Sequence, residues 1–229
     1  MYNKLSAKYS QMLDRALQHH QQGQLTEARD LYQKLLKVSP LNTLILTNLG
    51  SITLQTGDIA LGIRLIEKSV SLDPNQSFAF NNLGNAFAQH KRFEEAIACF
   101  QKSLAIEPNN AQAYANLGIA LKSIKEYDKA ILNFNLSLSI DPLNAVTYFN
   151  RGAVFKKLNQ SQNALLSYDL AIAINPDYAE AYCSRGDVYL SLERYEDSFS
   201  DFQRALNLNP YFVEVYINLG ILCFFTGSI

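Results

Sequence analysis

The chain has 229 residues, of which 48% are hydrophobic and 18% charged, and its formal net charge is −1. A charge this close to zero gives no broad field to attract nucleic acid or an anionic membrane, so we expect neither as a partner. The sequence has no apolar stretch near the roughly 20 residues that a membrane span needs, and it has no secretory signal. Its three cysteines, Cys99, Cys183 and Cys223, are too scattered for a disulfide framework. These features predict a reduced, cytoplasmic protein.

The prolines reveal an internal repeat. All six recur at intervals of 34 residues, at Pro40, Pro74, Pro108, Pro142, Pro176 and Pro210. A fixed period of about 20 to 50 residues indicates a stacked-repeat architecture. With proline at position 32, the register predicts an N-terminal extension over 1–8, six full repeats, and helix A of an incomplete seventh repeat over 213–229. The full repeats span 9–42, 43–76, 77–110, 111–144, 145–178 and 179–212.

Each repeat is predicted to form two helices. In the third repeat, Phe80, Leu83, Gly84 and Phe87 are spaced i, i+3, i+4 and i+7, and a second apolar series begins at Ala96. The residues of each series lie on one face of their own helix, and a polar break near position 15 separates the two helices. Proline then ends the second helix. The fold class is therefore all-α, with a helix A, a short turn and a helix B in every repeat.

Small residues recur where these helices would cross. Position 8 of helix A is glycine in six repeats: Gly50, Gly84, Gly118, Gly152, Gly186 and Gly220. Position 20 of helix B is also small, and positions 4, 11 and 24 are mostly bulky. Glycine inside an exposed helix costs about 0.5–1 kcal/mol relative to alanine, so its recurrence predicts a close helix crossing. At position 7, Arg15, Arg151 and Arg185 replace leucine, and we expect their stems to lie on apolar surface with their heads in water.

The segment NLGNAFAQHKRFEEAIACFQKSLAIEPNN, residues 82–110, resembles the tetratricopeptide repeat, and the resemblance extends over residues 9–227. It implies a right-handed superhelical solenoid of stacked antiparallel helix pairs. It also implies a non-catalytic scaffold that binds a protein or peptide and needs no cofactor.

In this family, helix-A positions 2, 5, 6, 9, 12 and 13, here called the groove positions, face the binding groove. Position 6 is asparagine in five repeats: Asn48, Asn82, Asn116, Asn150 and Asn218. An asparagine amide offers donors and an acceptor that can pair with a passing peptide bond. Other candidate groove residues are Asn81, Asn85, Lys122 and Lys156. The alternative is that these asparagines form only a tolerated polar face.

A narrower resemblance concerns the first two repeats. HHQQGQLTEARDLYQKLLKVSP, residues 19–40, and the repeat after it resemble the opening repeats of bacterial relatives of O-linked N-acetylglucosamine transferase. This resemblance implies an alternative function, the substrate-recognition arm of a protein O-glycosyltransferase whose catalytic domain is absent from this chain.

The sequence contains no recognisable catalytic or metal-binding motif. It has three histidines, no cysteine pair at zinc spacing and no glycine-rich phosphate loop, so we expect neither an enzyme nor a metal site. The C-terminal segment offers Leu222, Phe224 and Phe225 as an apolar tail. This tail predicts either a fragment of a longer protein or a surface for a partner or a second copy.

Overall fold

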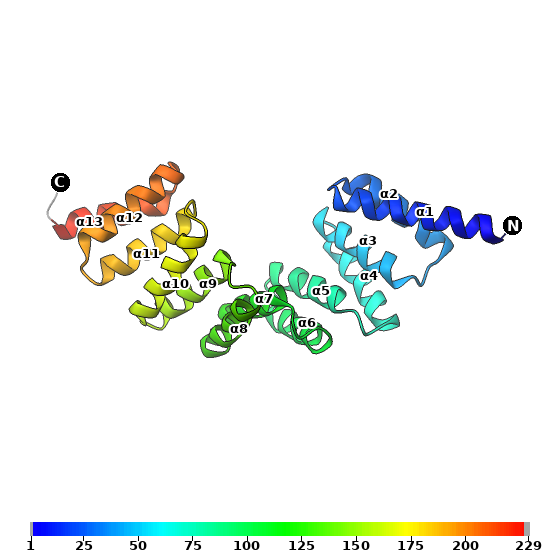
Figure 1. Ribbon diagram of the computed structural model, residues 1–229, viewed down its shortest axis with the longest axis horizontal. Coiled ribbons are helices and arrows are strands. Elements are labelled where there is room, and N and C mark those ends of the chain that lie inside the picture. The colour runs from blue at the N-terminus through cyan, green and yellow to red at the C-terminus, as the bar shows by residue number, and fades with distance from the viewer. Residues whose placement is uncertain (1, 227–229) are drawn as a thin grey trace. The chain divides into compact units, whose positions relative to one another are not determined.

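The computed structural model describes the backbone of residues 2–226 and the side chains of residues 7–225, and its regular structure there is entirely α-helical. The chain divides into unit 1, residues 1–108, and unit 2, residues 109–229 (Figure 1). Unit 1 contains α1 (Tyr2–Gln21), α2 (Leu25–Val38), α3 (Thr43–Gln55), α4 (Ile59–Leu72), α5 (Ser77–Gln89) and α6 (Phe93–Ile106). Unit 2 contains α7 (Ala111–Ser123), α8 (Tyr127–Ile140), α9 (Ala145–Lys157), α10 (Ser161–Ile174), α11 (Ala179–Ser191), α12 (Tyr195–Leu208) and α13 (Val213–Thr226).

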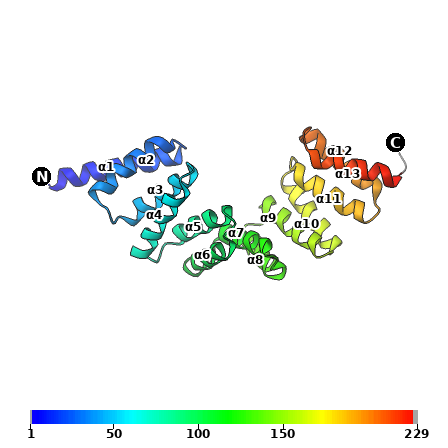
Figure 2. The same cartoon turned by 180° about the vertical axis from the view of Figure 1, so that it is seen from behind.

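The helices pack as sequential antiparallel pairs, which confirms the predicted fold class. Within each unit, every helix A packs on the helix B that follows it in sequence, from α1 on α2 to α11 on α12. Both views of the chain show this arrangement (Figure 1, Figure 2). Each helix B also contacts the next helix A of its unit, as α10 contacts α11. Among residues 2–226, no helix combines the length and the hydropathy that crossing a membrane requires.

Local sequence signals set the helix ends. Helices α2, α4, α6, α8, α10 and α12 each end two residues before a proline of the repeat. The intervening residue still donates its N–H into the helix, as Asp73 does to the Ser69 carbonyl at 3.0 Å, and proline cannot continue that series. At the other end of the repeat, the side chains of Asn42, Asn110 and Asn144 cap the next helix A by accepting a backbone hydrogen bond.

The turn between the two helices requires a left-handed residue at position 15. Glycine takes this place in two repeats, with φ of 73° at Gly23 and 95° at Gly57. In later repeats the same conformation falls on residues with side chains: Lys91, Lys125, Asn159 and Glu193. A side chain disfavours this region, so these turns carry local strain that the glycine turns avoid.

Replacing Lys125, whose φ is 64°, by glycine should therefore raise the free energy of unfolding by about 0.5–1 kcal/mol, measured by urea denaturation. The matched control is Lys129→Gly inside α8, where the same substitution should destabilise the helix. A loss of stability in Lys125→Gly would contradict the strain argument.

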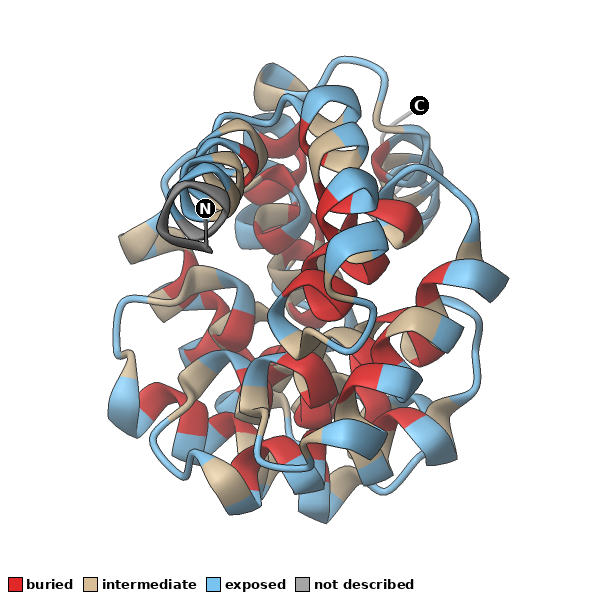
Figure 3. Cartoon of the chain, turned by 90° about the vertical axis from the view of Figure 1, so that its right-hand side faces the viewer, coloured by how far each residue is buried: buried red, intermediate tan, exposed pale blue. Residues whose placement is uncertain are grey.

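The core of each pair is a contact between position 8 of helix A and position 24 of helix B. A Cβ atom built on Gly84, Gly118 or Gly186 would lie only 2.5, 2.6 or 2.7 Å from a ring atom of Phe100, Phe134 or Phe202. These rings are at most 1% exposed. Figure 3 shows that the buried residues lie where helices face one another. The predicted close crossing is confirmed in these pairs, because a Cβ atom in place of the glycine hydrogen would overlap the ring.

Gly118→Ala should lower the free energy of unfolding by about 1–3 kcal/mol, because its Cβ would force Phe134 or the backbone to move. Gly220→Ala in α13 is the control at the same register position. There, no heavy atom of the described residues lies within 4 Å of the added Cβ, so alanine should be neutral or slightly stabilising. Equal effects of the two substitutions in urea denaturation would refute the steric explanation.

The prediction that the position-7 arginines keep their heads in water is wrong for two of them. Arg185 donates Nε and Nη2 to the two carboxylate oxygens of Asp201, each at 2.7 Å, and Nη1 to Asp169 at 2.6 Å. Arg151 donates to Asn135 at 2.8 Å and to Ser167 at 3.3 Å. Burial raises the pKa of Asp201, which is 5% exposed, and its hydrogen bonds with Arg185 oppose that rise.

Arg185→Leu should cost about 3–5 kcal/mol of stability at neutral pH, because it leaves the buried Asp201 carboxylate without its cation. The double variant Arg185→Leu with Asp201→Asn should recover most of that loss, since the chain itself combines Leu117 and Asn133 at these register positions. In the single variant the folded-state pKa of Asp201 rises further, so folding takes up a proton. The difference in free energy of unfolding between the single and the double variant should therefore shrink as pH falls from 7 to about 4. Denaturation at each pH measures this difference.

The C-terminal helix differs from the sequence-based expectation. Leu222 is 3% exposed and lies in a core cluster with Cys183, Phe202 and Val215, so its assignment to an exposed apolar tail is wrong. This follows from the repeat, because Leu222 faces the preceding pair. Phe224 and Phe225 are 83% and 60% exposed, as expected. The last part of the predicted seventh repeat, residues 227–229, lies outside the described residues.

Candidate functional site

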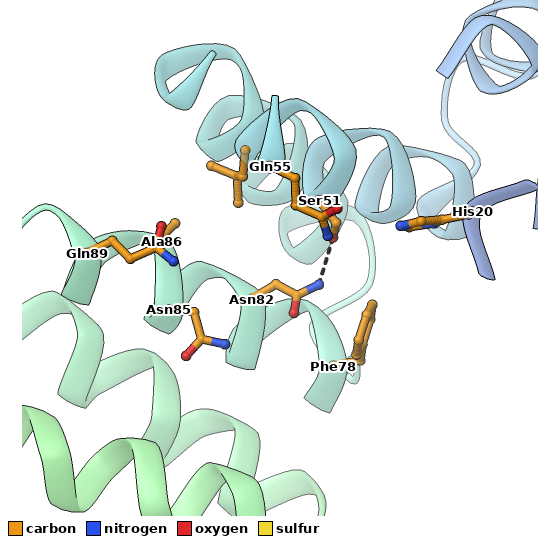
Figure 4. A pocket seen from close by; sticks show the side chains of 9 residues that line it. His20, Ser51, Gln55, Phe78, Asn82, Asn85, Ala86 and Gln89 are labelled. Atoms are coloured by element: carbon orange, nitrogen blue, oxygen red, sulfur yellow. Dashed lines mark hydrogen bonds between the residues drawn. The ribbon is translucent and has the colours of Figure 1, made fainter. Parts of the chain in front are cut away.

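An open pocket in unit 1 is formed at the groove positions. It has a volume of about 320 Å³, and helices α1, α3 and α5 contribute its walls (Figure 4). All but one of its lining residues occupy positions 2, 6, 9, 12 or 13 of a helix A. The lining residues are His20, Ser51, Leu54, Gln55, Phe78, Asn82, Asn85, Ala86 and Gln89.

The pocket is neutral and rich in amides. Asn82 donates Nδ2 to Ser51 Oγ at 2.7 Å, and Figure 4 shows its amide oxygen turned away from Ser51. Asn85 and Gln89 follow along the same helix. Burial lowers the pKa of His20, so the imidazole is neutral at pH 7. The exposed ring of Phe78 adds an apolar wall, which leaves the pocket lining without a formal charge.

The other predicted groove residues of unit 1 do not line this pocket. Asn48 is 7% exposed and donates Nδ2 to the Leu44 carbonyl of its own helix at 2.9 Å. Asn81 is half-buried on α5 and also lies outside the pocket lining. The structure therefore brings together Asn82 and Asn85 but not Asn48 and Asn81.

In unit 2, Asn150 is held on two sides. It is 8% exposed, accepts a hydrogen bond from Lys122 Nζ at 2.6 Å and donates to the Val146 carbonyl at 2.9 Å. Burial lowers the pKa of Lys122. Asn116 accepts a hydrogen bond from Gln112 at 2.8 Å. Gln112 and Asn150 both line a smaller pocket, of about 170 Å³, between α7 and α9.

The remaining two predicted residues meet at one carboxylate. Lys156 Nζ lies 2.6 Å from Asp187 Oδ2, and Asn218 donates to Asp187 Oδ1. Asp187 and Asn218 also line a pocket of about 420 Å³ near the exposed Phe225. Asn218 is at position 6 and Asp187 is at position 9 of the preceding repeat. The hydrogen bond from Asn82 to Ser51 joins the same two register positions. Several of the predicted asparagines therefore join neighbouring helices A.

One group of side chains has the composition of a metal site. Ligand atoms of Cys183, Asp187 and Glu214 lie within 4.8 Å of one another. However, Asp187 is already neutralised by Lys156 and bonded by Asn218. Burial, with the nearby carboxylates, raises the pKa of the Cys183 thiol to about 12, so it is protonated at neutral pH. In the described part of the chain, this cluster is better explained as a charge-balanced contact between repeats than as a metal centre.

Among the residues of the unit 1 pocket that sequence reasoning missed are His20, Ser51 and Phe78. They occupy groove positions 12, 9 and 2, so the register alone could have identified them. The prediction rests on the asparagines that repeat at position 6, whereas these three residue types differ from repeat to repeat.

The sequence matches models of a known repeat family along most of its length. A TPR repeat model matches residues 84–125 and 155–192. Three tetratricopeptide repeat models match residues 13–77, 111–142 and 179–212. The chain is a tetratricopeptide repeat protein. The matching models describe repeats alone and no catalytic domain, and they give no specific support to the resemblance to the glycosyltransferase arm. No curated protein matches the sequence.

Solved structures share the fold. Pseudomonas aeruginosa PilF is 18% identical, with a TM-score of 0.82 over 94% of this chain and 98% of that chain. MamA is 25% identical, with a TM-score of 0.67 over 70% of this chain and 94% of that chain. YrrB, described as a TPR protein with an unusual peptide-binding site, is 16% identical, with a TM-score of 0.70 over 82% of this chain and 97% of that chain. Since 442 solved chains match, the shared fold by itself does not select a partner.

Proposed function

We propose that this tetratricopeptide repeat scaffold binds an extended, uncharged segment of a partner protein, and that the unit 1 pocket is its main contact. The observation that carries the proposal is the neutral, amide-rich lining that the groove positions of α1, α3 and α5 form together. A pocket without charged side chains selects against charged segments, because these would lose hydration without gaining an ion pair.

The pocket offers the two kinds of contact that an extended peptide needs. Amide side chains supply donors and acceptors for backbone N–H and C=O groups, and each hydrogen bond would contribute about 0.5–1.5 kcal/mol. Phe78, which is 59% exposed, offers a ring against which an apolar side chain can pack. Several such contacts together are required for useful affinity, so we expect recognition of a segment rather than of a single residue.

Unit 2 supports a secondary contact of different character. Lys122 is paired with the neutral amide of Asn150, so its positive charge is not cancelled. Lys156 is paired with Asp187, which cancels its charge. An acceptor or an acidic group of the partner would therefore interact with Lys122 more strongly than with Lys156. The description of YrrB as a peptide-binding TPR protein is consistent with this function at the level of the fold.

Two further expectations belong to this proposal. We expect the chain to act without catalysis of its own, as the repeat-only family matches suggest. We also expect a reducing, cytoplasmic setting, since none of Cys99, Cys183 and Cys223 takes part in a disulfide. No observation favours the O-glycosyltransferase arm over a general interaction scaffold.

A random peptide library displayed on phage and selected on the full chain should yield uncharged segments, and Asn82→Ala should weaken the selected peptides about tenfold. The triple variant that also changes Asn116 and Asn150 to alanine should bind the peptides no more tightly than Asn82→Ala does. Circular dichroism of the triple variant should show the same helix content as the unchanged chain. Asn133→Ala is the matched control, because Asn133 lies on helix B and donates to Lys129 of its own helix. Unchanged affinity in Asn82→Ala, or an equal loss in Asn133→Ala, would remove the pocket from the proposal.

A further inference from the structure

Asn82 of the unit 1 pocket presents a hydrogen-bond acceptor whose direction the fold determines. Ser51 donates its hydroxyl hydrogen to the Thr47 carbonyl at 2.9 Å, so its oxygen can only accept the bond from Asn82. The NH₂ group of Asn82 must therefore face Ser51, at 2.7 Å. Figure 4 shows the amide oxygen turned away from Ser51, and no described residue donates a hydrogen bond to it. A partner that uses this oxygen has to bring a donor.

Phe78 adds an exposed ring one helical turn before Asn82. Its side chain is 59% exposed, and residues four apart on a helix hold their Cβ atoms about 5–6 Å from each other. A partner ring that packs against Phe78, with the two centroids about 4.5–7 Å apart, therefore brings its edge within reach of the Asn82 oxygen. Figure 4 shows His20 of α1 across the pocket from Phe78, so the partner ring would be covered from a second side.

The walls around this acceptor carry no formal charge. Helices α3 and α5, which hold Ser51, Phe78 and Asn82, contain no charged residue at all. The pocket lining also includes no carboxylate. A cationic donor would therefore lose its hydration in the pocket without gaining an anion, so the matching donor is an uncharged one.

We propose that the unit 1 pocket recognises a tryptophan or tyrosine of the bound segment, whose ring packs against Phe78 while its N–H or O–H donates to the Asn82 amide oxygen. The inference rests on the proposed function and names the residue that anchors the segment in that pocket. Tryptophan and tyrosine are the side chains that combine a large ring with an uncharged donor.

Other side chains satisfy only one of the two contacts. A phenylalanine of the partner would cover Phe78 but would also bury the Asn82 oxygen without a donor, which costs more than leaving that oxygen in water. A serine or threonine would supply the donor but leave the ring of Phe78 exposed to solvent. The pair formed by Phe78 and Asn82 therefore selects for a ring and a donor in the same side chain.

The test begins with the peptides that the phage library yields on the full chain. They should share a tryptophan or tyrosine at one position, more often than phenylalanine. In synthetic peptides, tyrosine is replaced by phenylalanine, and tryptophan by benzothienylalanine, which has sulfur in place of the indole N–H. Each replacement keeps the ring and removes the donor, and it should weaken binding about three- to tenfold, measured by fluorescence anisotropy.

Variants of the protein assign the two contacts separately. On Asn82→Ala, removing the donor from the peptide should cause no further loss, because the acceptor is already absent. On Phe78→Leu, a peptide with leucine in place of its aromatic residue should bind nearly as well as the original peptide. Phe199→Leu is the matched control, because Phe199 is 45% exposed but lies on helix B α12, away from the groove positions, and its substitution should leave every affinity unchanged.

The outcomes separate this inference from the proposed function. Uncharged peptides that depend on Asn82 but share no tryptophan or tyrosine would overturn the inference and leave the peptide contact in place. Donor-free peptides that bind as tightly as the originals, or that lose as much affinity on Asn82→Ala as on the unchanged chain, would do the same. A selection that yields no peptide sensitive to Asn82→Ala would overturn both.

Discussion

The contact between a glycine of helix A and a bulky residue of helix B is the interaction on which the other features of the structure depend. An added Cβ at Gly118 would lie 2.6 Å from Phe134, and the ring itself is fully buried. Glycine inside a helix costs about 0.5–1 kcal/mol, whereas burying a large side chain contributes about 1.5–3 kcal/mol. The balance favours a close crossing. Since that crossing uses positions 7, 8 and 11 of helix A, the groove positions on its other side remain for binding.

Position 7 adds variety without altering the crossing. Where it is leucine, as at Leu117, the facing helix has an uncharged residue at position 23, namely Asn133. Where it is Arg185, that position is Asp201, and the two form a bidentate ion pair. Exchanging the two kinds of helix B would bury an unpaired carboxylate or leave a guanidinium without its partner. Such mismatches would destabilise a wrongly paired helix A and helix B. Positions 7 and 23 therefore help to determine which helix B pairs with which helix A.

Much of the fold could be predicted because the proline spacing fixed the register, and helices α3, α5, α7, α9, α11 and α13 begin at the predicted repeat starts. The close crossing followed from residue size alone. The hydrogen bonds could not be predicted in the same way. Arg185 bonds to residues 16 positions away on either side, and periodicity indicates proximity but not which polar atoms meet. The prediction of one apolar surface fails for Leu222 because nearby residues on a helix face different directions, so Leu222 is buried while Phe224 is exposed.

The position-6 asparagines show that one register position can serve different purposes. Asn150 is bonded on both sides of its amide, to Lys122 and to Val146, so its main contribution is structural. Asn82 donates only its Nδ2 group to Ser51, which fixes the side chain with its oxygen turned outward. Immobilising a flexible side chain on binding costs about 0.5–1.5 kcal/mol, and at Asn82 the fold has already imposed that order. In the proposed peptide contact, the bond between repeats would leave Asn82 ready to accept a hydrogen bond from the partner, whereas the same kind of bond at Asn150 would remove it from that role.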